Sequence, residues 1–318
     1  AFGNLVPRDV ASRAAKERCD KGYGVNNTGL AVFLDFSEAI NRLGKDVVAQ
    51  RYGNLFDMYE EITDVSPYEN PMMIYPAIHY TMGGIWVDYE LMTSIKGLFA
   101  IGECNFSDHG ANRLGASALM QGLADGYFVL PYTIQNYLAD QITVPRFSTD
   151  LPEFAAAEKA VQDKIDWMMN IKGKKSVDSI HKELGHIMWE YVGMGRTAEG
   201  LKEGLKKLKE VRKEFEKELF IPGDKEGMNV ELDKAIRLYD FITMGELVAY
   251  DALNRNESCG GHFREEYQTE EGEAKRDDEN YFYVACWEYQ GSDEKEPVLL
   301  KEPLVYEAIK VQTRNYKS

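Results

Sequence analysis

The stretch Gly97-Leu-Phe-Ala-Ile-Gly-Glu103 decides the fold that we expect for the middle of this chain. Its run of four apolar residues lies between two glycines and predicts a short, fully buried strand. A polar loop follows, and residues 116–138 then predict an apolar, mostly buried helix that bends near Pro131. A strand, a polar loop and a buried helix, with glycines where backbones approach closely, are typical of a cofactor-binding turn.

Changes in composition and apolar pattern along the chain divide it into four predicted domains. Residues 1–75 and the glycine-dense residues 76–133 mix apolar runs of helical and strand character. Residues 134–253 carry amphipathic patterns whose short connections predict an antiparallel helical bundle. Residues 254–318 begin with a polar loop and continue with strand-like runs, which predict a small α/β domain. We therefore expect an α+β chain of several domains.

The spacing of apolar residues predicts the individual elements. Leucines at 201, 205 and 208 open a series with helical spacing, and Lys and Glu fill most other positions. This pattern predicts an amphipathic helix that begins near Thr197 and ends before Pro222. The other predicted elements are helices at 9–20, 37–52, 155–169, 177–191 and 230–253, and strands at 30–35, 281–287 and 304–311.

The chain of 318 residues is acidic, because 37 Lys and Arg against 53 Asp and Glu give a net charge of −16 at pH 7. Nucleic acids and anionic membrane surfaces attract basic patches, so this charge argues against both as partners. No apolar run approaches the roughly 20 residues that span a bilayer. The four cysteines are far apart and form no CxxC pair. We therefore expect no metal site and a reduced, cytoplasmic protein.

Three basic residues of this acidic chain have sequence neighbours that are typical of functional sites. Arg8 stands beside Asp9, His79 shortly precedes the Gly83-Gly84 pair, and Arg113 comes just before the apolar helix. A positive cluster suggests a site for an anionic small molecule, because the Arg fork binds carboxylates bidentately and stays charged. Each residue also has an ordinary alternative role. Arg8 would pair with a nearby acid such as Asp9, His79 would be a core histidine, and Arg113 would cap loop carbonyls.

Five motifs in a fixed order carry a resemblance to a known family. In chain order they are Pro7-Arg-Asp-Val10, Ile78-His-Tyr-Thr-Met-Gly-Gly-Ile85, Gly97-Leu-Phe-Ala-Ile-Gly-Glu103, His109-Gly-Ala-Asn-Arg-Leu-Gly115 and Arg255-Asn-Glu-Ser-Cys-Gly-Gly-His262. Together they resemble the flavoprotein subunit of fumarate reductase and succinate dehydrogenase, and the resemblance runs essentially from end to end. The run Gly84-Ile-Trp-Val-Asp-Tyr-Glu90 resembles the menaquinone-linked branch of that family.

The resemblance implies that this chain is the C-terminal half of such a subunit. The family carries its GxGxxG unit, and the histidine that bonds FAD covalently, in the first half, and no GxGxxG opens a βαβ unit here. Residues 1–75 then correspond to part of the capping domain and 76–133 to the return segment of the FAD-binding domain. Residues 134–253 correspond to the helical domain and 254–318 to the C-terminal domain. We expect the isolated chain to bind FAD weakly or not at all, and to be inactive.

The resemblance also implies roles for single residues. Arg8 matches the proton-donating arginine of the family, and His79 and Arg113 match residues that hold the dicarboxylate. Glu103 matches a glutamate that bonds the ribityl arm of the flavin. The matching positions that contact the flavin at the helix N-terminus are Ser117, Ala118 and Leu119.

Two departures from the family pattern limit this transfer. The family has Asn-Ser-Leu at the helix N-terminus, so Ala118 lacks the hydroxyl of the family serine and we expect backbone contacts there. Cys259 stands where the family usually has Arg, so its loop is assigned no role. His262 keeps the family pattern, and we expect a structural role for it.

The implied activity is the interconversion of fumarate and succinate, with hydride from flavin N5 and a proton from Arg8. The implied partners are an iron–sulfur subunit and a membrane anchor, with electrons exchanged with menaquinone at the cytoplasmic face of the membrane. Two alternatives stay open. L-aspartate oxidase shares the fold and similar motifs, although its usual chain lacks an extension as long as residues 264–318. The isolated chain is alternatively a folded, non-catalytic scaffold fragment.

Overall fold

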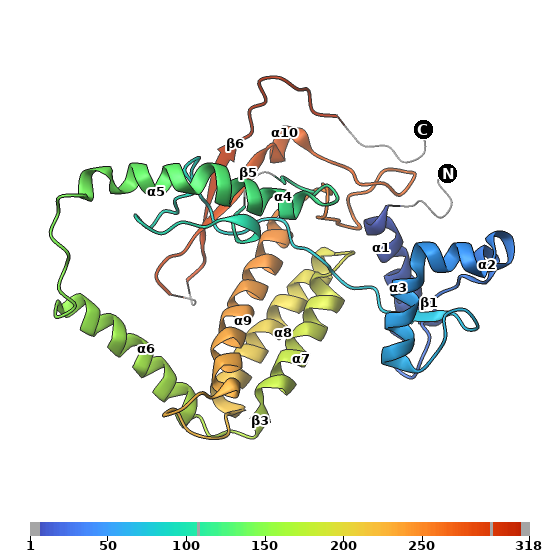
Figure 1. Ribbon diagram of the computed structural model, residues 1–318, viewed down its shortest axis with the longest axis horizontal. Helices are drawn as coiled ribbons and strands as arrows, with labels where there is room; N and C mark the ends of the chain where they lie inside the picture. Colours follow the sequence, from blue (N-terminus) through green and yellow to red (C-terminus); the bar gives the residue numbers. More distant parts are fainter. Residues whose placement is uncertain (1–6, 107–108, 293–294, 313–318) are drawn as a thin grey trace. The chain divides into compact units, whose positions relative to one another are not determined.

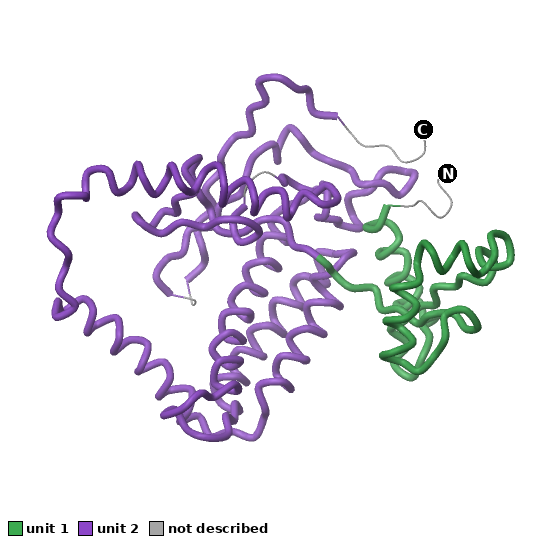
Figure 2. Tube along the Cα trace, viewed as in Figure 1, with its two compact units in different colours: residues 1–79 green, residues 80–318 purple. Residues whose placement is uncertain are grey.

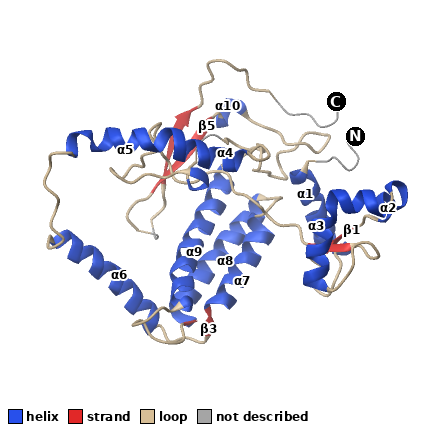
Figure 3. Cartoon of the chain, viewed as in Figure 1, coloured by secondary structure: helices blue, strands red, loops and turns tan. Residues whose placement is uncertain are grey.

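The computed structural model describes residues 7–106, 109–292 and 295–312. The chain forms two compact units, Ala1–His79 and Tyr80–Ser318 (Figure 2). Helices dominate the described residues, and the short strands, red in Figure 3, form two-stranded sheets. The predicted mixture of helices and strands is confirmed. The four predicted domains divide the chain more finely than these two units and stay a prediction.

The first unit surrounds a small aromatic core. Phe56 is fully buried, and its ring meets those of Phe36 and Tyr68 edge-on at centroid distances of 5.0 and 4.8 Å. Val48 and Met72 complete the buried cluster. The elements around it are α1 (Arg8–Arg18), β1 (Val32–Leu34), α2 (Ser37–Leu43), α3 (Lys45–Thr63) and β2 (Met72–Ile74), with β1 and β2 antiparallel (Figure 1).

The predicted helix at 37–52 is wrong in its bounds. Gly44 has φ +87°, which ends α2 and lets α3 begin in a new direction. α3 then continues to Thr63, well beyond the predicted end. The predicted helix at 9–20 and the strand at 30–35 are confirmed by α1 and β1.

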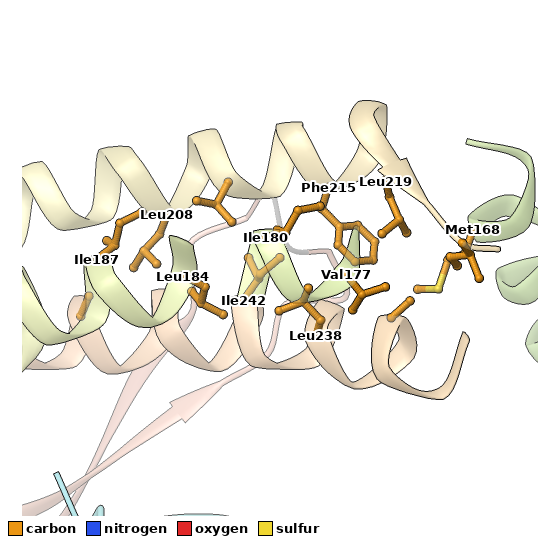
Figure 4. Packing of buried hydrophobic residues seen from close by; sticks show 14 of the residues in the cluster. Met168, Val177, Ile180, Leu184, Ile187, Leu208, Phe215, Leu219, Leu238 and Ile242 are labelled. Atoms are coloured by element: carbon orange, nitrogen blue, oxygen red, sulfur yellow. The ribbon is translucent and has the colours of Figure 1, made fainter. Parts of the chain in front are cut away.

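A helical bundle forms the main core of the second unit. α7 (Val177–Ile187), α8 (Ala198–Glu218) and α9 (Val230–Asn254) lie side by side, and α6 (Pro152–Asn170) contacts α9 (Figure 1). Figure 4 shows Leu208, Phe215 and Leu238 among the buried side chains of this core. Each such side chain contributes about 1.5–3 kcal/mol by leaving water. β3 (Lys175–Ser176) and β4 (Leu219–Phe220) pair in parallel beside it.

Side-chain caps fix the starts of the two long helices, as the sequence predicts for α8. The Thr197 hydroxyl accepts a hydrogen bond from the Gly200 N–H at 3.0 Å. The Asn229 side-chain oxygen accepts one from the Leu232 N–H at 3.1 Å. Each bond satisfies a backbone donor that the first turn of a helix leaves free. These caps explain why the predicted bounds of α8 and α9 are close to the observed ones.

A short two-stranded sheet follows the bundle. β5 (Tyr283–Glu288) pairs antiparallel with β6 (Val298–Pro303), after the single turn of α10 (Asp278–Tyr281). The strand predicted at 281–287 is confirmed, whereas the one predicted at 304–311 is wrong. The ladder ends at Pro303, because proline has no N–H to donate.

The residues between the two units' boundary and the bundle are rich in loops. α4 (Ser117–Ala124), a π-helical turn (Asp125–Val129) and α5 (Leu130–Leu138) form one interrupted helix. Pro131 lies in the first turn of α5, directly after the π-helical turn, so the hydrogen-bonding pattern of the helix changes near this residue. The predicted bend itself stays a prediction.

Two predictions for this region are wrong. The run Leu98–Ile101 is not a strand, because its only ladder contact among the described residues is an isolated bridge between Met92 and Phe99. The interrupted helix is not mostly buried, because Leu119 is 78% and Phe128 is 74% exposed. No described helix is long and apolar enough to cross a bilayer.

Candidate functional site

The motif that follows His79 lies directly against the turn that carries Glu103. The Ile85 N–H donates to the Cys104 carbonyl at 2.8 Å, and the Phe106 N–H donates to the Ile85 carbonyl at 3.1 Å. Gly84 has φ +143°, and a Cβ atom there would lie 2.5 Å from the Cys104 oxygen. The close approach predicted for the glycine pair therefore occurs at Gly84, where a larger residue would separate the two segments.

A buried polar network fixes the Glu103 turn, Gly102–Cys104, to α4. The Asp125 carboxylate accepts from the Gly102 N–H at 2.8 Å and from the Asn105 amide at 3.3 Å. The Gln121 amide donates to the Asn105 side-chain oxygen at 2.8 Å. These three side chains are at most 4% exposed. These hydrogen bonds hold the members of the network in one arrangement, so Glu103 projects from a fixed turn.

Arg113 is held by an aromatic ring rather than by an acid. Its guanidinium carbon lies 4.5 Å from the centroid of the Tyr80 ring, a cation–π contact worth roughly 0.5–1 kcal/mol at a partly exposed position. Its Nη1 donates to the Leu114 carbonyl at 3.2 Å, which confirms part of the carbonyl-capping alternative. Among the described residues no carboxylate pairs with Arg113. This half-buried cation can therefore bind an anion from outside the chain.

Tyr80 and His109 are site residues that the sequence reasoning missed. Burial raises the pKa of Tyr80, the Glu103 charge raises it further, and the Arg113 charge opposes both. The His109 ring packs edge-on against Tyr80 at 5.9 Å between centroids. Its Nε2 is buried and has no hydrogen-bond partner among the described residues. A signal was present, since Tyr80 directly follows His79 and His109 opens the Arg113 motif.

The N-terminus of α4 is open to an anionic group. Ala116 precedes the helix with φ +64°, and no side chain caps the first turn. The Ser117 hydroxyl donates instead to the Leu114 carbonyl at 2.6 Å. The N–H groups at Ala118 and Leu119 therefore have no capping partner, and the positive end of the helix dipole favours a negative charge there.

Arg8 and His79 belong to the first unit, and both are exposed. Arg8 is the first residue of α1, directly after Pro7. Asp9 pairs with Arg13 at 3.4 Å and not with Arg8, so the first ordinary alternative is wrong. The exposure of His79 also contradicts its alternative as a core histidine. Within the described part of the first unit, neither side chain forms an ion pair.

Three comparisons with known proteins agree with this geometry. The family model described as fumarate reductase flavoprotein C-term matches residues 181–316, and the FAD binding domain model matches residues 2–119. The chain is 33% identical over 268 residues to the succinate dehydrogenase flavoprotein subunit of Bacillus subtilis strain 168, covering 84% of this chain and 44% of that subunit. It is 32% identical over 286 residues to the fumarate reductase flavoprotein subunit of Escherichia coli strain K12, covering 88% and 44%.

The same likeness holds for a solved structure of a quinol-fumarate reductase with menaquinol molecules. The TM-score is 0.80 and the identity 28%, over 96% of this chain and 50% of that chain. The chain thus spans about half the length of the relatives that it matches.

These findings define an FAD-linked flavoprotein fold. The chain belongs to the family of flavoprotein subunits of fumarate reductase and succinate dehydrogenase, which are FAD-dependent oxidoreductases. The family match confirms the predicted fold class, and it favours the predicted fumarate reductase and succinate dehydrogenase family over the L-aspartate oxidase alternative. The residues present also fit FAD, because the open N-terminus of α4 and the rigid Glu103 turn offer donors and an acceptor to an anionic, polyhydroxylated cofactor.

Proposed function

We propose that this chain is part of an FAD-dependent enzyme that interconverts fumarate and succinate. The observation that carries the proposal is the placement of Arg113, which lies on the Tyr80 ring without a described acidic partner in a chain of net charge −16. An arginine without an acidic partner among the described residues is suited to a small dianion, because its fork binds a carboxylate bidentately.

The proposed roles of the other residues follow from their chemistry. Arg113 binds one carboxylate of the substrate, and His79 donates a hydrogen bond to the substrate as well. Arg8 gives a proton to the substrate carbon during fumarate reduction. Because a guanidinium releases its proton very reluctantly, this transfer requires tight positioning and a route that returns the proton. FAD, when bound, supplies and accepts the hydride.

The FAD-binding residues would be Glu103, through its carboxylate, and Ser117, Ala118 and Leu119 at the start of α4. Ala118 has no polar side-chain atom, so it would bind through its backbone N–H. Positive charge at the helix N-terminus stabilises negative charge on the cofactor.

Further protein is proposed to complete this site. Large apolar side chains of the interrupted helix stay exposed, although such residues are normally buried. They are Leu119, Met120, Leu123, Tyr127 and Phe128. The relatives are about twice as long as this chain, which supports the view that additional polypeptide packs on this face in the assembled flavoprotein.

The proposed partners are an iron–sulfur subunit and a membrane anchor that exchanges electrons with menaquinone. They would place the flavoprotein peripherally at the cytoplasmic face of the cell membrane. The likeness to a quinol-fumarate reductase with menaquinol molecules supports this part of the proposal.

Fumarate-dependent oxidation of a reduced viologen tests the function in the FAD-loaded flavoprotein that contains this chain. Arg113→Gln should lower kcat/KM by on the order of a hundredfold to a thousandfold, because a charged donor in the site is lost. Arg237→Gln is the matched control, since Arg237 is an exposed residue of α9 paired with Asp233.

Two results would contradict the proposal. A flavoprotein with full FAD content and no fumarate turnover would move the function to another substrate. Equal activity in the Arg113→Gln and Arg237→Gln variants would remove Arg113 from the site.

A further inference from the structure

A tight hairpin, Cys259–His262, touches the loop that carries Arg113. The Cys259 N–H donates to the His262 carbonyl at 2.8 Å, and the His262 N–H donates back at 3.0 Å. Between them, the Gly261 N–H donates to the Ala111 carbonyl at 2.8 Å. Ala111 lies two residues before Arg113, so a backbone hydrogen bond joins this hairpin to the Arg113 loop.

The contact between the hairpin and the Arg113 loop leaves no room for a side chain at Gly260. Its φ is +59°, and a Cβ atom would lie 2.1 Å from the Ala111 oxygen. Any side chain at this position would force the two backbones apart. Gly272, in a nearby turn, offers a comparison, because its φ is +79° but the nearest atom to its Cβ position is Gln268 Oε1 at 3.7 Å.

His262 fastens the hairpin through both ring nitrogens. Arg196 Nη1 lies 2.7 Å from His262 Nδ1, and His262 Nε2 lies 2.9 Å from the Arg255 carbonyl. Because a guanidinium only donates, Nδ1 must accept, and the Nε2–H must donate to the carbonyl. Burial and then the Arg196 charge lower the pKa of His262 to about 4, so the ring is neutral, as this arrangement requires.

The hairpin is also tied to both long helices of the bundle. Arg196 precedes the cap of α8, and its N–H donates to the Phe263 carbonyl at 3.1 Å. Arg264 is only 2% exposed, and its Nη1 donates to the Ala252 carbonyl in the last turn of α9 at 3.0 Å. Hydrogen bonds near α8 and α9 thus hold the residues that flank the hairpin, and the hairpin itself contacts the Arg113 loop.

We propose that the Cys259–His262 hairpin positions Arg113 for dicarboxylate binding, with Gly260 and His262 as positioning residues. This inference rests on the proposed function, since it assigns a task to the loop that holds the proposed substrate ligand. The hairpin transmits the rigidity of the bundle to Arg113 through the Gly261–Ala111 hydrogen bond.

The test measures the Kd of succinate from the flavin absorbance change in the FAD-loaded flavoprotein, and KM and kcat for fumarate. Gly260→Ala should weaken succinate binding on the order of tenfold to a hundredfold, because a small displacement of a binding group has a large effect. Gly272→Ala introduces similar backbone strain away from the loop and should change the Kd less than twofold. In an Arg113→Lys background, Gly260→Ala should add little further loss.

A pair of variants at His262 tests the same support without a glycine substitution. His262→Gln keeps one acceptor and one donor and should stay near the wild-type Kd. His262→Leu loses both and should match Gly260→Ala, at full FAD content. This pair decides the question if Gly260→Ala does not fold.

The outcomes separate the two proposals. Equal Kd values for Gly260→Ala and Gly272→Ala, or for His262→Leu and His262→Gln, would overturn the positioning role while a weakened Arg113→Lys variant kept the proposed function. An unchanged Kd in Arg113→Lys would instead overturn the proposed function, and the positioning role with it.

Discussion

α8 and the interrupted helix α4–α5 bury opposite kinds of residue. α8 turns Leu201, Leu208 and Phe215 inward, and each is fully buried. The interrupted helix buries polar side chains and exposes its apolar ones. Gln121 and Asp125 face inward and hold the Glu103 turn. Leu119, Tyr127 and Phe128 are exposed.

This contrast separates a self-sufficient core from an incomplete one. The bundle buries a large cluster of apolar side chains among its own helices, and this burial stabilises it. The site region uses its buried face for hydrogen bonds and leaves its apolar face uncovered by any described residue. We therefore expect the bundle to contribute most of the free energy of unfolding. We expect ligand binding at the candidate site to depend on the polypeptide that covers α4.

The largest expected effect is a difference in unfolding free energy between two leucine-to-alanine variants of this chain, one in α8 and one in α4. Leu208→Ala should lower the free energy of unfolding by about 2–5 kcal/mol, because a fully buried side chain leaves a cavity. Leu119→Ala should change it by less than about 0.5 kcal/mol, because Leu119 is 78% exposed. Urea denaturation followed by circular dichroism measures both values.

The comparison would break if the two leucines had similar effects. A large loss in Leu119→Ala would mean that the apolar face of α4 is already covered in this chain, for example by a second copy. In the assembled flavoprotein, by contrast, Leu119→Ala should become costly.

A smaller effect is expected where the bundle meets the site loop. The pKa of His262 is lowered from 6.5 to about 4, so protonation favours the unfolded chain. The stability that the neutral ring contributes is present above about pH 6.5 and is lost as the pH falls toward 4. That loss amounts to about 3 kcal/mol, from a shift of roughly 2.5 units at 1.36 kcal/mol per unit.

The measurement compares wild type with His262→Gln, which keeps both hydrogen bonds but cannot titrate. Between pH 7 and pH 4, wild type should lose more unfolding free energy than the variant. If the unfolding free energies of the two proteins fell in parallel with pH, the hydrogen bond between Arg196 and His262 would not form in solution.

The next smaller effect is a local loss of stability at the candidate site when Asp125 is replaced. Asp125→Ala removes the acceptor of the Gly102 N–H and leaves that donor buried, which costs about 1–3 kcal/mol. We expect this loss to appear locally, as faster amide hydrogen exchange at residues 102–105, with little change in α8. Thr133→Ala is a control, because Thr133 is equally buried but bonds the Glu90 carbonyl at 2.7 Å. Protection lost equally at residues 102–105 in both variants would contradict a network centred on Asp125.

The bundle was predictable because its pattern and its environment agree. The leucine spacing of α8, the Thr197 start and the strand at 281–287 each follow from local rules that the tertiary structure respects. The buried helix and the strand at 98–101 failed, because apolar composition predicts burial and pairing without saying which surface provides them. The polar face of the interrupted helix became the inner face because Asp125 accepts from the Gly102 N–H and Gln121 donates to the Gly102 carbonyl there.

The sequence proposes charged residues for the candidate site but does not indicate which residues support them. Arg113 could be singled out because a basic residue in a glycine-rich motif is conspicuous in an acidic chain, whereas Glu103 was assigned through the family resemblance. Tyr80, His109 and the Gly260 contact depend on loops meeting across large sequence distances, about 30 residues for Arg113 with Tyr80 and about 150 for Gly260 with Ala111. Such contacts leave no spacing pattern.

The smallest expected effect concerns the ring beneath Arg113. Tyr80→Phe keeps the aromatic face and should leave the KM for fumarate within about twofold, whereas Tyr80→Leu removes the cation–π contact and should raise KM about three- to fivefold, equivalent to roughly 0.5–1 kcal/mol. The kcat at saturating fumarate should change less, because the ring orients Arg113 rather than touching reacting atoms. If Tyr80→Phe were as impaired as Tyr80→Leu, the hydroxyl rather than the ring face would be the functional group.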